Sequence, residues 1–129
     1  MAADLEFPVV RESASASALR QRVRSFLQDE LDQGRFNPRR GTWTHFDPAF
    51  SERCGAQGFI GVTWPRRWGG QEMSFLERHV ILEEMLACGA PVGAHWMAER
   101  QSALQLQRFG QAAVRDRLLP EIAAGRCYF

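Results

Sequence analysis

The sequence contains no lysine, and all 16 of its basic side chains are arginine. With 15 acidic side chains the formal net charge is +1, so no bulk attraction to nucleic acid or to an anionic membrane is expected. Adjacent arginines occur only at Arg39–Arg40 and Arg66–Arg67, in turn-like stretches, and we expect both pairs to be solvated. No apolar run is long enough to span a bilayer, and no signal segment follows Met1.

Cysteine is scarce as well. The three cysteines, Cys54, Cys88 and Cys127, are widely spaced and form no CxxC pair. Neither a zinc site nor a disulfide framework is therefore expected. A reducing, cytoplasmic location is the expectation that follows.

The common motifs of catalysis and nucleotide binding are missing: there is no nucleophile elbow, Walker loop, HExxH or GxGxxG. His45, His79 and His95 lack the spacing of metal ligands, and we expect them to be hydrogen-bonded inside the protein or exposed at its surface. Glu83 and Glu84 interrupt an apolar stretch, and pairing with arginine or exposure is the expectation for them rather than catalysis. No catalytic residue, cofactor ligand or metal ligand is predicted within this chain.

Apolar periodicity predicts five helices and no hairpin. They cover about residues 15–33, 48–57, 75–88, 93–109 and 111–124. The connections are short, which favours a helical bundle with antiparallel neighbours. Pro120 falls inside the last helix, where it should produce a kink or cost a hydrogen bond. Two tryptophans, Trp64 and Trp68, lie in a loop and are predicted to fold back against the helices as anchors.

Two of the helix starts carry capping residues. Asp47 precedes Pro48, which suits the first turn because its missing N–H costs nothing there. Ser74 and Glu77 form a capping box, in which each side chain bonds the backbone of the other. The helix that follows Ser74 is apolar around most of its circumference, so we expect it at the centre of the bundle.

The fourth predicted helix is unusual because polar and charged side chains surround its middle. Regular α-helical spacing puts Met97, Gln101 and Leu104 on one face. One interpretation is an amphipathic helix with local ion pairing, for example between Glu99 and Arg100. The other is that Met97, Gln101 and Leu104 line a ligand cavity, where an apolar wall with a few polar groups is expected.

Four segments, in order, resemble the N-terminal domain of acyl-CoA dehydrogenases. They are CGAQGFIGVTWP at residues 54–65, WGGQEMS at 68–74, LEEM at 82–85, and FG at 109–110 followed by LLPEIAAG at 118–125. The ordered set covers nearly the whole chain and accounts for Pro120. Two departures stand out: Arg67–Trp68 replaces the usual acidic–aromatic pair, and His95–Trp96 is bulky for a pocket wall.

The resemblance implies an all-α domain of about five helices, the first of three domains. It divides the chain into a flexible arm at 1–14, the helical domain at 15–125, and the start of a β-strand and of a truncated β domain at 126–129. It implies a reaction in which a carboxylate removes the α proton of an acyl-CoA thioester and FAD accepts the β hydride. In the family the base and the main FAD site lie in the other domains, so no such residue is carried over.

What the resemblance carries over is the acyl pocket wall, assigned to Met97, Gln101 and Leu104. FAD is expected in the full-length enzyme and not in this chain alone. The expected partners are an acyl-CoA substrate and a homo-oligomer or hetero-oligomer of dehydrogenase subunits, with no nucleic acid or membrane. Two alternatives stay open: a helical interaction module that pairs with itself or with a complete dehydrogenase subunit, and a small-ligand or acyl-binding bundle.

Overall fold

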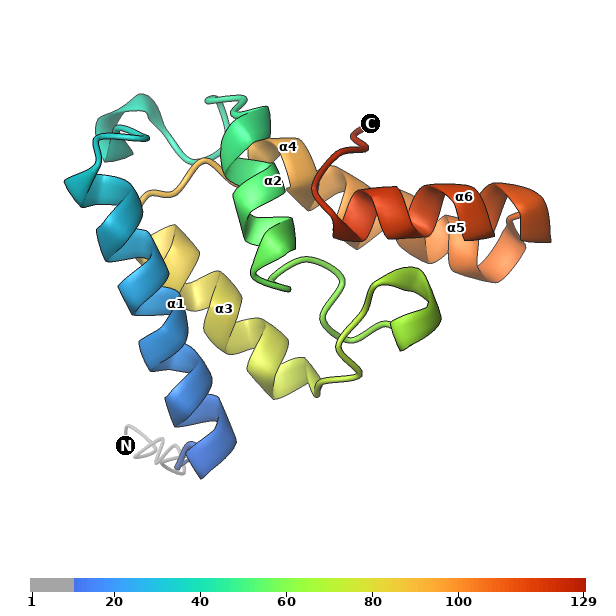
Figure 1. Cartoon of the computed structure of the whole chain (residues 1–129), viewed down its shortest axis with the longest axis horizontal. Helices are drawn as coiled ribbons and strands as arrows, with labels where there is room; N and C mark the ends of the chain where they lie inside the picture. Colours follow the sequence, from blue (N-terminus) through green and yellow to red (C-terminus); the bar gives the residue numbers. More distant parts are fainter. Residues whose placement is uncertain (1–10) are drawn as a thin grey trace, which may run out of the picture.

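The computed structural model describes residues 11–129 (Figure 1). Most of the arm predicted at residues 1–14 lies outside the described residues, and α1 already begins at Ala14. Within residues 11–129 the fold is all-α and contains no strand, which confirms the predicted class and the five predicted helices. The helices are α1 (Ala14–Asp32), α2 (Pro48–Ala56), α3 (Phe75–Ala87), a long helix over residues 93–109, and α6 (Ala112–Ala123).

The long helix is continuous but not uniform. It consists of α4 (Gly93–Met97), a π-helical turn (Ala98–Ser102) and α5 (Ala103–Phe109). The backbone N–H of Ala103 bonds to the carbonyl of Ala98, five residues earlier, in place of the four of an α-helix. Both alanines are fully buried, since the wider turn brings them to the same side of the helix.

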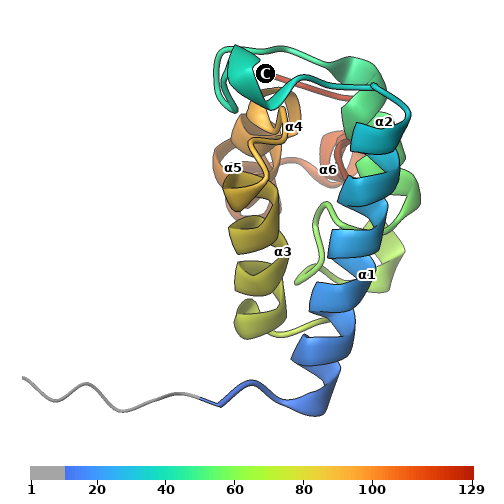
Figure 2. The same cartoon turned by 90° about the vertical axis from the view of Figure 1, so that its left-hand side faces the viewer.

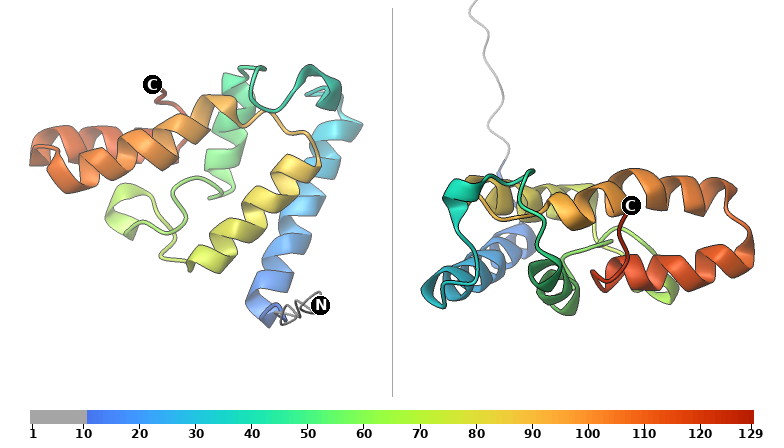
Figure 3. Two further views of the ribbon diagram at one scale, coloured as in Figure 1. Left: turned by 180° about the vertical axis from the view of Figure 1, so that it is seen from behind. Right: turned by 90° about the horizontal axis from the view of Figure 1, so that it is seen from above.

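The helices form two packed groups (Figures 1 and 2). α1 and α3 lie side by side with α2 next to them, and α5 and α6 form an antiparallel pair that extends away from the other helices (Figure 3). The buried core follows this division. One cluster joins α1, α2 and α3 through Val23, Leu27, Phe50, Cys54, Phe59 and Met85, among others. A second joins α6 and the π turn through Trp64, Trp68, Ala98, Ala103, Leu119 and Ile122.

The capping residues act as predicted. The carboxylate of Asp47 accepts a 2.9 Å hydrogen bond from the N–H of Phe50 at the start of α2. At α3 both halves of the Ser74–Glu77 capping box are present. Trp64 and Trp68 are buried anchors, and the indole N–H of Trp68 donates to Asp116 of α6 at 2.9 Å. These contacts hold the loop before α3 against the second cluster.

The central position predicted for α3 is wrong. Val80, Ile81 and Met85 are buried, but Phe75 is 71% exposed, and Leu86 is also exposed. The apolar residues do surround the helix, yet only one side of it meets α1 and the core. The other side of α3 is an outer surface of the described part of the molecule.

The strand predicted at residues 126–129 is also not formed. Residues 11–129 offer no second strand whose backbone could complete its hydrogen bonds. The segment instead folds back toward α2, where the ring of Tyr128 packs edge-on against Phe46 with ring centroids 5.4 Å apart. Within residues 11–129, no helix has the length and apolar character needed to cross a membrane.

Candidate functional site

The three residues predicted to line an acyl pocket lie on the outer side of the long helix. Met97 and Leu104 are each 43% exposed, and Gln101 is exposed as well. The π turn lies between Met97 and Leu104, so the two side chains are not related by the regular α-helical spacing that predicted a shared face. Their role in an acyl pocket wall stays a prediction.

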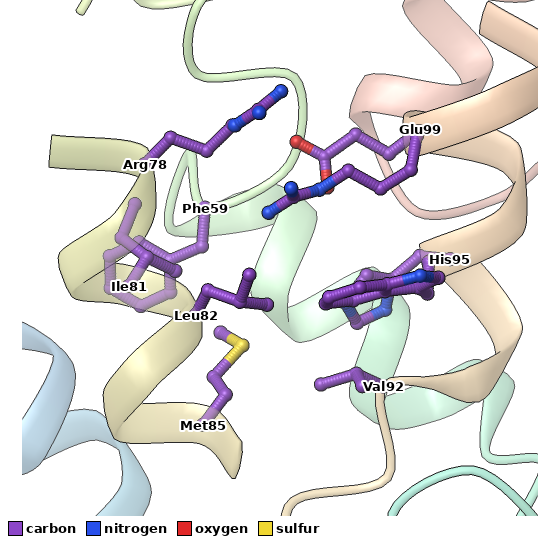
Figure 4. Close-up of a pocket in the computed structure, with 10 residues that line it drawn as sticks. Phe59, Arg78, Ile81, Leu82, Met85, Val92, His95 and Glu99 are labelled. Atoms are coloured by element: carbon purple, nitrogen blue, oxygen red, sulfur yellow. The ribbon is translucent and has the colours of Figure 1, made fainter. Parts of the chain in front are cut away.

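A small cavity of about 10 Å³ lies between α3 and the long helix (Figure 4), and none of those three residues lines it. That volume holds roughly one water molecule. Its apolar walls come from Phe59, Ile81, Leu82, Met85, Val92 and Trp96, and its polar groups from Arg78, His95, Glu99 and Arg100. Figure 4 shows the side chain of Arg78 reaching from α3 toward Glu99.

Glu99 is a buried carboxylate in the π turn, with 7% of its surface exposed. One of its oxygens, Oε1, accepts a 2.9 Å hydrogen bond from the backbone N–H of Gly61. Its other oxygen lies 3.7 Å from Nε of Arg100, which is too long for a hydrogen bond. Burial raises the pKa of Glu99, and the charge of Arg100 opposes that shift. The predicted pairing of Glu99 with Arg100 is thus present, but at long range.

His95 sits one turn before Glu99 and is also buried. Its Nδ1 lies 2.8 Å from the hydroxyl oxygen of Ser51 on α2, and its ring stacks near Phe50. Burial, with a smaller contribution from Arg100, lowers the pKa of His95 to about 4, so the ring is neutral at pH 7. His95 is therefore the hydrogen-bonded interior histidine that was predicted.

Arg100 is held in place by aromatic stacking. Its guanidinium carbon lies 4.6 Å from the centroid of the Trp96 ring, and Trp43 packs edge-on against Trp96 at 4.5 Å. Arg78, Trp96 and Gly61 were not predicted as site residues. The four-residue spacing of Trp96 and Arg100 could have predicted their stacking, because residues four apart are neighbours on a helix. The hydrogen bond from Gly61 to Glu99 could not be predicted in this way, because Gly61 lies in a loop far away in the chain.

A second polar cluster joins α1 to α3. Glu84 pairs with Arg20 and with Arg24, whose Nε lies 2.7 Å from Oε2 of the carboxylate. Arg20 also pairs with Glu83 at 2.7 Å. The hydrogen bond from Arg24 is the main reason that the pKa of Glu84 is lowered. The predicted arginine pairing of Glu83 and Glu84 is confirmed, and the cluster holds two helices together.

Comparison with known proteins identifies the family. The family model for the acyl-CoA dehydrogenase N-terminal domain matches residues 13–126, which is most of the chain. The chain belongs to the acyl-CoA dehydrogenase family. Its match is to the N-terminal helical domain of that family, as the resemblance of four segments predicted.

Relatives in this family are much longer than the chain. Mitochondrial isovaleryl-CoA dehydrogenase of Pongo abelii is 30% identical over 108 residues, which cover 83% of this chain and 26% of the relative. The acyl-CoA dehydrogenase FadE12 of Mycobacterium tuberculosis (strain ATCC 25618 / H37Rv) is 29% identical over 119 residues, covering 88% of this chain and 29% of the relative. The chain thus spans between a quarter and a third of the length of these two dehydrogenases.

Solved structures show the same fold. The Tcur3481-Tcur3483 steroid ACAD superimposes with a TM-score of 0.77 at 26% identity, over 92% of this chain and 31% of that one. A chain of the ChsE4-ChsE5 complex from Mycobacterium tuberculosis gives a TM-score of 0.75 at 21% identity. The match covers 95% of this chain and 31% of that one. The arrangement of helices described above is therefore that of the acyl-CoA dehydrogenase N-terminal domain.

The residues that the structure describes do not by themselves fit FAD. The cavity beside Glu99 holds about one water molecule, far below the several hundred Å³ of a typical cofactor pocket. A larger hollow of about 330 Å³ lies along α1 and α3, but its arginine, Arg24, is already paired with Glu84. Within residues 11–129 no group of histidine, cysteine or acidic side chains is arranged to hold a metal ion.

Proposed function

We propose that this domain belongs to a flavin-dependent acyl-CoA dehydrogenase, in which it forms part of the acyl pocket wall. The reaction is the α,β-dehydrogenation of an acyl-CoA thioester. The catalytic base and FAD are supplied outside the helical domain, so the chain alone is inactive. The boundaries proposed for this domain are residues 15–125, with a β domain beginning at 126–129.

The observation that carries the proposal is the family match over residues 13–126. The exposed side chains of the long helix agree with it. Met97 and Leu104 leave apolar surface in contact with solvent, while their chain neighbours Ala98 and Ala103 are fully buried. Apolar surface of this kind on a well-packed helix is expected to be covered by a ligand or by another part of a protein. The acyl chain of a substrate is the ligand proposed here.

The substrate is proposed as an acyl-CoA thioester and no narrower class. Isovaleryl-CoA dehydrogenase is named for a short branched acyl group, whereas the Tcur3481-Tcur3483 protein is named as a steroid enzyme. Both are similar to this chain at nearly the same identity, so neither name selects between fatty, branched and steroid acyl groups.

A second candidate function is a helical interaction module that pairs with itself or with a complete dehydrogenase subunit. The exposed rings of Phe75 on α3 and Phe109 at the end of α5 favour it, the latter being 78% exposed. The Tcur3481-Tcur3483 enzyme carries the names of two components. An oligomer of dehydrogenase subunits is compatible with both candidate functions.

The test measures acyl-CoA oxidation by the full protein that the gene encodes. Two variants are compared with the parent, Met97→Asp and Leu104→Asp. Each change places a charge on the proposed wall and should raise KM for acyl-CoA several-fold, because a buried carboxylate next to an acyl chain is unfavourable. Gln105→Asp, at an exposed position on the same helix, is the matched control and should leave KM unchanged.

Two results would contradict the proposal. One is an unchanged KM in both aspartate variants while the protein oxidises acyl-CoA. The other is stoichiometric FAD binding by the purified 129-residue chain, seen as a flavin absorption spectrum that survives gel filtration. The interaction module is instead supported if the protein does not oxidise acyl-CoA but co-elutes with a complete dehydrogenase subunit.

A further inference from the structure

The cavity between α3 and the long helix has an excess of positive charge at one end. Arg78 comes from α3, and Glu99 and Arg100 come from the π turn. The only carboxylate among the residues that line the cavity is Glu99, and it is already bonded to the N–H of Gly61. Two guanidinium groups therefore face one carboxylate, and the neutral ring of His95 adds no charge.

Arg100 has unused hydrogen-bonding capacity. Its Nε is buried and has no hydrogen-bond partner among residues 11–129. The nearest carboxylate oxygen, on Glu99, is 3.7 Å away, and the Trp96 ring occupies the face of the guanidinium rather than its edge. Burial lowers the pKa of Arg100; the charge of Glu99 opposes this shift and the charge of Arg78 adds to it, so an additional anion at this point would stabilise the charged form of Arg100.

Arg78 is similarly free to bind an anion. Its guanidinium stacks 4.8 Å from the ring centroid of Phe75, and no ion pair holds it within the described part of the chain. Figure 4 shows its side chain directed toward Glu99, at the same end of the cavity. Two guanidinium groups that approach from different helices match the paired oxygens of a carboxylate, which arginine binds through parallel N–H···O bonds.

The rest of the cavity is apolar. Leu82, Met85 and Val92 line the end away from the charged groups (Figure 4), whereas the Trp96 ring lies against Arg100. The present volume of about 10 Å³ admits a single oxygen-sized group, so a longer ligand requires these side chains to move. Val92 is fully buried in the core, so the side chains that would have to move are half-buried Leu82 and the adaptable thioether chain of Met85.

We propose that this cavity binds a short-chain carboxylic acid, with its carboxylate between Arg78 and Arg100 and its hydrocarbon end against Leu82 and Val92. The apolar walls favour a carboxylate with a short tail over inorganic phosphate, which is strongly hydrated and has no apolar part. The site is separate from Met97, Gln101 and Leu104. It does not depend on the function proposed above and can be tested on the chain alone.

The experiment is an NMR titration of the 15N-labelled chain with sodium butyrate at constant ionic strength. The Nε–H signal of Arg100 and the backbone amide of Gly61 should shift and saturate, with a dissociation constant on the order of 1 mM. Butyramide has the same shape without the charge and should produce no saturable shift. Inorganic phosphate should bind at least tenfold more weakly than butyrate.

Variants with effects in opposite directions separate specific binding from a general change in the protein. Arg78→Gln should weaken butyrate binding about tenfold, the value of one charge-assisted hydrogen bond. Glu99→Gln should strengthen it several-fold, since the amide oxygen still accepts from Gly61 but no longer repels the ligand. Arg117→Gln, an exposed position on α6, should leave binding unchanged.

The proposal is overturned if butyrate produces no saturable shift at Arg100. It is also overturned if butyramide or phosphate binds as well as butyrate, or if Glu99→Gln weakens binding as much as Arg78→Gln does. None of these outcomes bears on the family match or on the acyl pocket wall.

Discussion

The carboxylate of Glu99 accepts a 2.9 Å hydrogen bond from the backbone N–H of Gly61, which lies 38 residues earlier in the chain. Gly61 has a φ of 66°, and a Cβ at this position would lie 2.6 Å from the ring of Trp64. The buried carboxylate therefore fastens a tight glycine turn to the π turn of the long helix. The bond connects the two packed groups of helices at the point where their cores meet.

Removing this acceptor should destabilise the fold. Glu99→Ala leaves the buried N–H of Gly61 without a partner, which costs about 1–3 kcal/mol in addition to the cavity that the change creates. Glu99→Gln keeps an oxygen in the same place and should cost clearly less. Urea unfolding monitored by circular dichroism at pH 7 measures both. Equal losses in the two variants would show that the carboxylate charge, and not the bond to Gly61, matters.

His95 should make stability depend on pH in the weakly acidic range. Its folded pKa, about 4, lies below the ordinary value of 6.5, so the unfolded chain takes up a proton that the folded protein refuses. The contribution is fully present above pH 6.5 and is lost as the pH falls toward 4, by roughly 3 kcal/mol in total.

His95→Gln tests this dependence. The variant should be less stable than the parent at pH 7.5, since it disturbs the buried contact with Ser51, but its stability should change much less between pH 6.5 and 5. His79→Gln is the control, because His79 is exposed and the slope should stay that of the parent protein. Parallel pH profiles for His95→Gln and the parent would refute the assignment.

The sequence was sufficient for the features that depend on neighbours along the chain. The capping box at Ser74 and the cap at Asp47 involve residues three positions apart, and both were predicted and are present. The arginine pairing of Glu84 was predicted only as a type of contact. Its partners Arg20 and Arg24 are 64 and 60 residues away, and only the packing of α1 on α3 brings them together.

Contacts between distant parts of the chain were not predicted. The apolar residues of α3 were counted around the whole helix, but burial depends on which side meets a neighbour, and Phe75 does not. The prediction for Met97 and Leu104 assumed regular helical spacing, and nothing in the sequence indicated the π turn that lies between them. That turn is stabilised by the hydrogen bond that the Gly61 N–H donates to Glu99 and by burial of Ala98 and Ala103, and neither is encoded in local periodicity.

The cluster between α1 and α3 should stabilise the protein at neutral pH and lose this effect in acid. The pKa of Glu84 is lowered in the folded state, so its contribution is present above the ordinary carboxyl pKa and disappears as the pH falls through the folded value. Glu84→Gln should cost roughly 1 kcal/mol at pH 7, and the difference from the parent protein should shrink below pH 4.

Glu83→Gln is the matched comparison for that change. Glu83 pairs with the same Arg20, but half of its side chain is exposed, so screening by solvent should make its loss smaller. Added salt should reduce the effect of Glu83→Gln more than that of Glu84→Gln. A larger loss from Glu83→Gln would mean that the pairing of Glu84 with Arg20 and Arg24 does not hold the two helices together.

The contact between α2 and the end of α6 should tolerate very little added volume. A Cβ on Gly55 would lie 2.3 Å from the carbonyl carbon and oxygen of Ala124, and backbone atoms cannot rotate aside as a side chain can. Gly55→Ala therefore forces the two helices apart and should cost about 3 kcal/mol or more.

Gly34→Ala separates this effect from backbone strain, because Gly34 has a φ of 62° and open space around it. Its cost should be about 1–2 kcal/mol, that of a left-handed conformation alone. Thermal unfolding of both variants gives the comparison, and a Gly55→Ala protein as stable as Gly34→Ala would show that α2 and α6 do not meet this closely.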